Sequence, residues 1–143
     1  MRISLSRGRP VRSMPRVTQI VVTSESKPGT LAQLCSTMGR AGVNIQSMLA
    51  PETRGRGKVR LLVDNPEKAK DALKAAKIRF SEEEVLALEL DNRPGSLGEV
   101  AEKLAKAKIN IKYAYATASE GSAKATVVLA VPNVTKAAGV LGE

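Results

Sequence analysis

Two short stretches of this 143-residue chain carry residue types that can bind a small charged molecule. They are ESKPGTL, from Glu25 to Leu31, and DNRPGSL, from Asp91 to Leu97. Each contains an acidic residue, a small polar residue, a basic residue, Pro-Gly, a hydroxyl residue and leucine. Proline stiffens such a turn, and glycine lets a ligand approach the backbone. The stretches therefore predict two turns in which a carboxylate could meet a cation and backbone N–H groups could meet an anion.

A helix is expected directly after each Pro-Gly. Thr30 and Ser96 are followed three places later by Gln33 and Glu99, which is the pattern of a capping box. The apolar positions that follow keep helical spacing. They are Leu31, Leu34, Cys35 and Met38 in the first stretch and Leu97, Val100, Ala101 and Leu104 in the second. Because a helix begins with unpaired N–H groups and a partial positive charge, each turn suits a carboxylate ligand.

The two stretches belong to one internal repeat. Sliding the chain on itself by 66 positions gives a match without gaps, and an agreement this long predicts two copies of one unit of about 65 residues. The identical pairs are Pro28/Pro94, Gly29/Gly95, Leu31/Leu97, Ala41/Ala107, Asn44/Asn110, Ile45/Ile111, Ala50/Ala116, Gly55/Gly121, Lys58/Lys124 and Pro66/Pro132. Gly42 is expected to end the first helix, and Lys108 at the matching position should require a different cap.

Each unit has the pattern of alternating strands and helices. Runs of β-branched and apolar residues predict strands at 17–23, 43–50, 59–63, 85–90, 109–116 and 125–131. Pro66 and Pro132 stand where a second helix would begin in each unit. A short strand near Lys77 to Ser81 would close the first unit. The order βαββαβ predicts an α+β fold of two tandem ferredoxin-like units, with antiparallel sheets and both helices on one face.

The second unit departs from this order. Only Asn133 to Glu143 follow Pro132, which leaves room for a short helix but not for a closing strand. We therefore expect the second unit to lack its last strand. The open sheet edge should then be covered by another unit or another chain.

We expect a basic extension at 1–16, then units at 17–82 and 83–143. The segment Met1 to Ser13 contains four arginines and no acidic residue. The segment is typical of a disordered tail, and it would also arise if the true start is Met14 and Met1 is an upstream start codon. A nucleic-acid arm and a transit peptide are further alternatives. No apolar run suitable for a secretory signal follows it.

Composition limits the chemistry. A single cysteine excludes an intrachain disulfide framework and a Cys-rich zinc site, and the absence of histidine removes the usual general base and the commonest metal ligand. No apolar run approaches the ~20 residues of a membrane span. We expect a cytoplasmic protein with no membrane attachment, no catalytic residues, no metal and no cofactor.

The sequence resembles the ACT domain, a small regulatory module that binds amino acids. The resemblance lies in DNRPGSLGEVAEKLAKAKINI and ESKPGTLAQLCSTMGRAGVNI, each a Pro-Gly turn, a helix and the pattern (A/G)-x-(V/I)-N-I, and it extends from Val17 to about Glu143. Small bacterial proteins with two ACT domains and no attached enzyme are the most similar type. The resemblance implies ACT units paired side by side, a homodimer, and an amino acid held between units near the turn.

The resemblance also implies which residues contact the ligand. In the second copy they are Asp91, Asn92, Gly95, Ser96, Leu97 and Asn110. In the first copy they are Glu25, Ser26, Gly29, Thr30, Leu31 and Asn44. Because Ser26 replaces the amide of Asn92, the second copy fits the family pattern better.

Three functions remain open. An amino-acid-binding regulatory or sensor protein, acting through assembly or a partner, is the first, and a regulatory subunit of an amino-acid biosynthetic enzyme is the second. RNA binding is the third; the net charge of +9 and the basic turn from Arg54 to Lys58 favour it, but the expected first and third strands lack the aromatic residues that stack RNA bases. We therefore do not expect a nucleic-acid partner. Cys35 lies on an apolar helix stripe without a histidine to activate it, so an enzyme is disfavoured.

Overall fold

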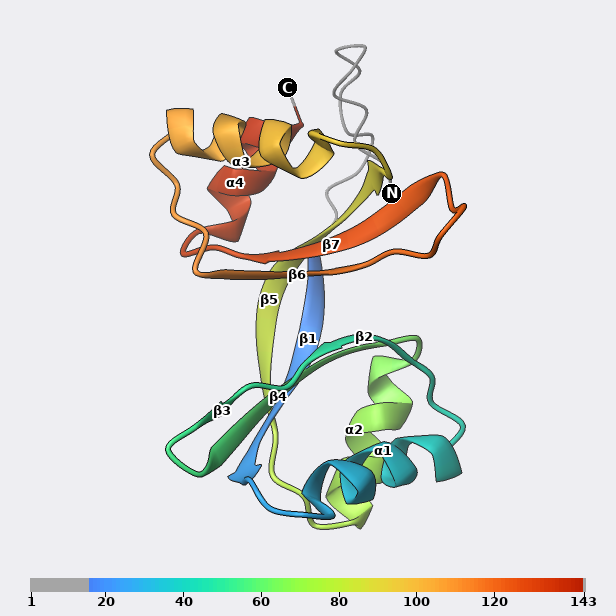
Figure 1. Ribbon diagram of the computed structural model, residues 1–143. Helices are drawn as coiled ribbons and strands as arrows, with labels where there is room; N and C mark the ends of the chain where they lie inside the picture. The colour runs from blue at the N-terminus through green and yellow to red at the C-terminus, as the bar shows by residue number, and fades with distance from the viewer. Residues whose placement is uncertain (1–15, 143) are drawn as a thin grey trace. The chain divides into compact units, whose positions relative to one another are not determined.

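The computed structural model describes residues 16–142, which form an α+β protein with four helices and antiparallel strand pairs (Figure 1). The chain divides into two compact units at Glu83/Glu84. We call residues 18–83 the first unit and residues 84–142 the second unit. The basic extension expected at 1–16 lies outside the described residues except for Arg16, which begins the first strand.

The first unit contains one antiparallel sheet with two helices on one face. Its elements are β1 (Arg16–Glu25), α1 (Thr30–Arg40), β2 (Ile45–Leu49), β3 (Glu52–Thr53), β4 (Arg56–Val63) and α2 (Pro66–Ala75). The strands pair in the order β2-β4-β1, and β3 also pairs with β4. The buried core joins the sheet to both helices and consists of Ile20, Val22, Leu34, Met38, Val43, Val59, Leu61, Val63, Ala69 and Leu73.

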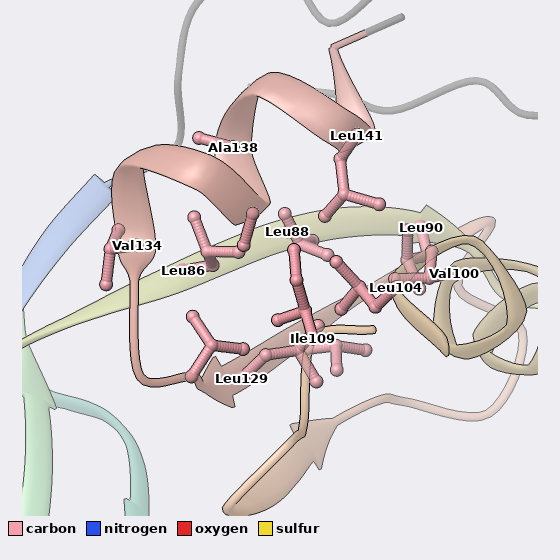
Figure 2. Packing of buried hydrophobic residues seen from close by; sticks show 13 residues of the cluster. Leu86, Leu88, Leu90, Val100, Leu104, Ile109, Leu129, Val134, Ala138 and Leu141 are labelled. Carbon is pink, nitrogen blue, oxygen red and sulfur yellow. The ribbon is translucent and has the colours of Figure 1, made fainter. Parts of the chain in front are cut away.

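The second unit repeats this plan. Its elements are β5 (Ser81–Asp91), α3 (Ser96–Lys106), β6 (Tyr113–Thr117), β7 (Lys124–Ala130) and α4 (Val134–Leu141). The strands pair in the order β5-β7-β6. Figure 2 shows leucines of β5 and β7 packed against Leu104 of α3 and Leu141 of α4. The α+β, tandem ferredoxin-like prediction is confirmed.

The strand expected near Lys77 to Ser81 does not exist as a separate element. The Ile78 N–H donates to the Leu73 carbonyl at 2.9 Å and ends α2, and the chain then passes through 78–80 without regular structure. Ser81 already begins β5, which continues to Asp91. Within residues 16–142, no strand follows α4, as expected from the short C-terminal segment.

The predicted capping boxes are wrong. The N-cap residues of α1 and α3 are Gly29 and Gly95, with φ of 93° and 89°, and neither helix has a side-chain cap. This left-handed conformation favours glycine because it has no Cβ. The Thr30 hydroxyl instead donates to the Glu25 carbonyl at 3.1 Å, and Glu99 pairs with Arg93. The glycine of each Pro-Gly pair is therefore required by the turn itself.

The expectation of a different cap at Lys108 is also wrong. Gly42 and Lys108 have φ of 74° and 60°, so both helices end through a left-handed residue. The Val43 N–H donates to the Met38 carbonyl at 3.0 Å, and the Ile109 N–H donates to the Leu104 carbonyl at 2.9 Å. Both helices therefore end in a Schellman motif. In the second unit the left-handed position is occupied by a lysine instead of a glycine, which strains the backbone.

The repeat has a two-residue insertion that the ungapped match misses. Ile20 pairs with Leu61 in the first unit, whereas Leu86, its equivalent, pairs with Leu129. The offset is therefore 66 through β6 and 68 from β7 onward, and the extra residues lie in the β6–β7 hairpin. The pairs Lys58/Lys124 and Pro66/Pro132 are not structural equivalents. Pro132 lies outside α4, whose N-cap is Asn133.

Candidate functional site

The first Pro-Gly turn connects the end of β1 to the start of α1. The Thr30 N–H donates to the Lys27 carbonyl at 3.2 Å and closes the turn around Pro28 and Gly29. The Ser26 N–H donates to the Gly55 carbonyl at 2.8 Å and fixes the turn to the β3–β4 hairpin. Five of the six predicted contact residues of this copy, Glu25, Ser26, Gly29, Thr30 and Leu31, therefore lie together here.

An open hollow of about 150 Å³ lies beside this turn. Turn residues form one side of it, and residues 50–52 with the start of β4 form the other. The lining residues are Ser24, Glu25, Ser26, Lys27, Thr30, Leu31, Ala50, Pro51, Glu52, Gly57 and Val59. Ligand pockets usually enclose about 300 Å³ or more, so this hollow forms only part of a binding pocket.

The hollow offers groups that suit a zwitterion. Leu31 lines the hollow and Ala32 is the next residue of α1. Their N–H groups have no hydrogen-bond acceptor among residues 16–142, because α1 lacks a side-chain cap. Glu25 and Glu52 supply carboxylates on the same surface, and the Ser26 hydroxyl donates to Glu52 Oε1 at 3.2 Å. Helix N–H groups favour a carboxylate and glutamates favour an ammonium, so both ends of a free amino acid find partners.

Leu31 adds an apolar surface beside these groups. It is 43% exposed, although it is the second residue of a helix with an otherwise well-buried apolar face. Leu97 holds the same place in α3 and is also 43% exposed, and these two are the exposed large hydrophobic residues of the described chain. An exposed leucine repeated at equivalent positions indicates a contact with a ligand or a second surface.

The second Pro-Gly turn has a different environment. Asp91 Oδ1 forms an ion pair with Lys124 Nζ. The Asn92 side-chain amide donates to the carbonyls of Ser119 at 3.4 Å and Ser122 at 3.0 Å. Arg93 Nη2 donates to both carboxylate oxygens of Glu99, at 3.1 and 3.0 Å.

The remaining predicted residues of this turn differ in exposure. Gly95 and Leu97 are exposed, whereas Ser96 is buried. The second turn therefore has more side-chain bonds within its unit than the first, in which Ser26 donates to Glu52 and Glu25 makes only a loose contact with Lys27 at 3.8 Å.

Asn44 and Asn110 do not join the turns. Each follows the C-terminal end of the helix that begins at its turn, and an 11-residue helix is about 16 Å long. Asn44 is exposed, and its N–H donates to Asp64 Oδ1 at 3.0 Å while its carbonyl accepts from the Asp64 N–H at 3.1 Å. One small ligand cannot contact an asparagine and the turn of the same unit.

Sequence reasoning missed Glu52, Glu99 and Lys124. Glu52 reaches the hollow because β3 folds back on β4. Lys124 meets Asp91 through the β5–β7 ladder, at the position where Arg56 faces Glu25 in the first unit. Glu99 was assigned to a capping box, and its place three residues after Ser96 gave no sign that it would bind Arg93. Charge complementarity between Arg93 and Glu99 was the one signal available.

Three further features of residues 16–142 concern metal binding, membrane insertion and the single cysteine. Within that range, no three histidine, cysteine, aspartate or glutamate residues are grouped as a metal site would require. No helix there combines the length and apolarity needed to cross a bilayer. Cys35 is half-buried on α1 with a free thiol.

Comparison with known proteins decides the family. The sequence model of the ACT domain pair matches residues 15–142. The chain belongs to the ACT domain pair family. This ACT domain pair is structurally similar to a protein from Bacteroides thetaiotaomicron, with 26% identity, a TM-score of 0.82, and coverage of 90% of this chain and 88% of that one. No curated protein matches this ACT domain pair in sequence.

Two further structures share the fold of this ACT domain pair. One is the ligand-free regulatory subunit of aspartate kinase from Thermus thermophilus, with 14% identity, a TM-score of 0.63, and coverage of 92% of this chain and 93% of that one. The other contains aspartokinase alpha and beta subunits, with 16% identity, a TM-score of 0.60, and coverage of 89% and 90%. At these identities the likeness concerns the fold.

Proposed function

We propose that this ACT domain pair is a regulatory protein that binds a free amino acid at the first Pro-Gly turn. The observation that carries the proposal is the open hollow in which unpaired N–H groups of α1 and the carboxylates of Glu25 and Glu52 share one surface. The ligand carboxylate would bind the N–H groups of Leu31 and Ala32. Its ammonium would bind a glutamate.

We propose further that the ligand is enclosed by a second ACT surface, from the sister unit or another copy of the chain. The hollow is open and small, and Leu31 beside it is exposed. Asn44 and Asn110 lie a helix length from their own turns, so either could contact the same ligand only from a second unit. A homodimer would supply such surfaces.

Regulation then follows from linkage. A ligand that binds only the paired state stabilises it by RT ln(1 + [L]/Kd), which is about 2.7 kcal/mol at a hundredfold excess over Kd. The amino acid would thereby change assembly, or the contact with a partner, by at most its differential affinity for the two states.

A regulatory subunit of an amino-acid biosynthetic enzyme is the second candidate. The match to the aspartate kinase regulatory subunit covers 93% of that chain, so a regulatory subunit can consist almost entirely of this fold. Purification of the tagged chain from its source cells discriminates the two: a stoichiometric enzyme partner favours the subunit, and a homo-oligomer alone favours the free-standing sensor.

The test is a thermal-shift screen of the twenty amino acids at millimolar concentration, with molecular mass measured by light scattering in parallel. We expect one chemical class of amino acid to raise Tm and to favour the larger assembly. Asn44→Ala and Asn110→Ala, tested separately, identify the asparagine that contributes from the second surface, because one of them should reduce the shift. A flat response to all twenty amino acids contradicts the proposed function.

A further inference from the structure

We infer that the two Pro-Gly turns are functionally unequal: the second is occupied by side chains of its own unit, so that only the first is available to a ligand. The existence of a ligand depends on the proposed function. The inequality of the two turns is argued independently, from their contacts. It also reverses the expectation from the sequence pattern, which favours the second copy.

The acidic residue of the second turn is neutralised internally. Asp91 lies directly opposite Lys124 in the β5–β7 ladder and forms an ion pair with it. Its counterpart Glu25 lies opposite Arg56, yet no carboxylate of residues 16–142 lies within ion-pair distance of Arg56. Glu25 instead contacts Lys27 at 3.8 Å, with both side chains more than 60% exposed. Glu25 can therefore exchange this loose contact for a ligand ammonium, whereas Asp91 must give up a close ion pair.

The small polar residue of the second turn is also bonded within the unit. The Asn92 amide donates to the Ser119 and Ser122 carbonyls of the β6–β7 hairpin. These carbonyls lie in the part of the hairpin that is two residues longer than the β3–β4 turn. Both turns are fixed to their hairpins by an equivalent backbone bond, from the Ser26 N–H to the Gly55 carbonyl and from the Asn92 N–H to the Ala123 carbonyl. The insertion therefore adds the side-chain bonds of Asn92 to this shared contact. In the first unit, Ser26 makes one exposed side-chain bond, to Glu52.

The start of the helix differs most. Glu99 lies in the first turn of α3 and accepts both hydrogen bonds from Arg93, whereas the first turn of α1 contains no acidic residue. Gln33 occupies the matching position. A carboxylate at the helix N-terminus satisfies the partial positive charge that would otherwise attract the ligand carboxylate. An anionic ligand at α3 would therefore meet Glu99, which is paired with Arg93, whereas at the matching position of α1 it meets the neutral Gln33.

Hydrogen exchange of the ligand-free protein tests the inequality directly. Because more contacts must break for the second turn to open, the backbone N–H groups of residues 92, 93 and 95–97 should exchange about tenfold more slowly than those of residues 26, 27 and 29–31. Lys124→Met and Glu99→Gln, in separate proteins, should each remove part of this difference. Equal exchange of the two turns in the unmodified protein overturns the inference.

Calorimetric titration tests which turn binds. The probe is whichever of the twenty amino acids gives the largest thermal shift, and we expect one ligand per chain. Gln33→Glu should weaken binding at least about tenfold, because it gives α1 the acidic first turn of α3. Lys124→Met should leave Kd within about twofold, since the second turn takes no ligand.

Two ligands per chain, or a loss of affinity in Lys124→Met but not in Gln33→Glu, contradicts the inference. If no amino acid binds, the proposed function fails. The inequality of the turns is then decided by hydrogen exchange alone, so the two failures are distinguishable.

Discussion

Asn65 and Asn133 are structural equivalents although they are 68 positions apart, two more than Gly29 and Gly95. Asn65 Oδ1 accepts from the Lys68 N–H at 3.1 Å at the start of α2, and Asn133 Oδ1 accepts from the Lys136 N–H at 3.0 Å at the start of α4. The shared cap and the strand ladders agree on the position of the insertion. The first strand, the first helix and the second strand of each unit therefore repeat with an offset of 66 residues. The following strand and helix repeat with an offset of 68.

The first prediction concerns these caps. Asn65→Ala and Asn133→Ala should each lower the free energy of unfolding by about 1 kcal/mol, because an N–H in the first turn of the helix loses its acceptor. Urea unfolding followed by circular dichroism measures the change. Asn133→Asp keeps a side-chain acceptor and serves as the control. A neutral Asn133→Ala would mean that Asn133 does not cap α4.

The second prediction concerns the ends of α1 and α3. Lys108→Gly should stabilise the protein by up to about 1 kcal/mol, because a left-handed conformation costs a residue with a Cβ roughly that amount. Gly42→Ala should destabilise it by a similar amount. A Cβ at Gly42 would meet only Lys68 Nζ, at 3.8 Å, so backbone strain is the cause and not a clash. Opposite shifts of the urea midpoint check the pair; shifts of the same sign would contradict a shared C-cap geometry.

The third prediction contrasts two leucines of one helix. Leu104 is fully buried in the core of the second unit, and Leu97 is 43% exposed. Leu104→Ala should cost about 2–5 kcal/mol through lost burial and a cavity. Leu97→Ala should change the free energy of unfolding by no more than about 0.5 kcal/mol in the absence of ligand. Equal losses in thermal or urea unfolding would show that Leu97 already packs against a second surface.

The fourth prediction concerns pH. Lys70 Nζ lies 2.7 Å from Glu67 and 3.2 Å from Glu82. The hydrogen bond and charge of Lys70 hold the pKa of Glu67 below its ordinary value of 4.5. The hydrogen bonds that Lys70 donates to Glu67 and Glu82 raise the pKa of Lys70 above 10.5.

The sign follows from these two shifts. The lowered pKa of Glu67 contributes stability above pH 4.5, which is lost as the pH falls through the folded-state pKa. The raised pKa of Lys70 contributes stability below pH 10.5, which is lost as the pH rises through the folded-state pKa. Lys70→Met should therefore be less stable than the unmodified protein near neutral pH, with a difference that shrinks in acid. Lys106→Met, which removes an exposed lysine of α3, should show no such pH dependence. Thermal unfolding from pH 3 to 8 measures it, and a difference that is constant down to acid pH would contradict the role of Glu67.

Much of this protein is determined by local sequence. The alternation of Ile20 and Val22 and the helical spacing of Val100 and Leu104 determine which faces are buried, because these patterns depend only on the periods of strand and helix. The Pro-Gly turns and the glycine at position 42 mark where helices begin and end, because each glycine adopts a left-handed conformation that favours a residue without a Cβ. The duplication, and with it the ACT family and the tandem fold, could be predicted from these repeated signals.

Tertiary structure alone decided what each copy does with its turn. Which residue faces Asp91 depends on the pairing of strands that are distant in sequence. The two extra hairpin residues shift the equivalent of Arg56 to Lys124 without leaving a local signal. Glu52 reaches the hollow of the first unit through strand pairing, and Glu99 is committed to Arg93 through the geometry of the turn. The sequence thus specifies two similar turns, and long-range pairing makes them different, because ion pairs and hydrogen bonds depend on distances in space that residue spacing does not determine.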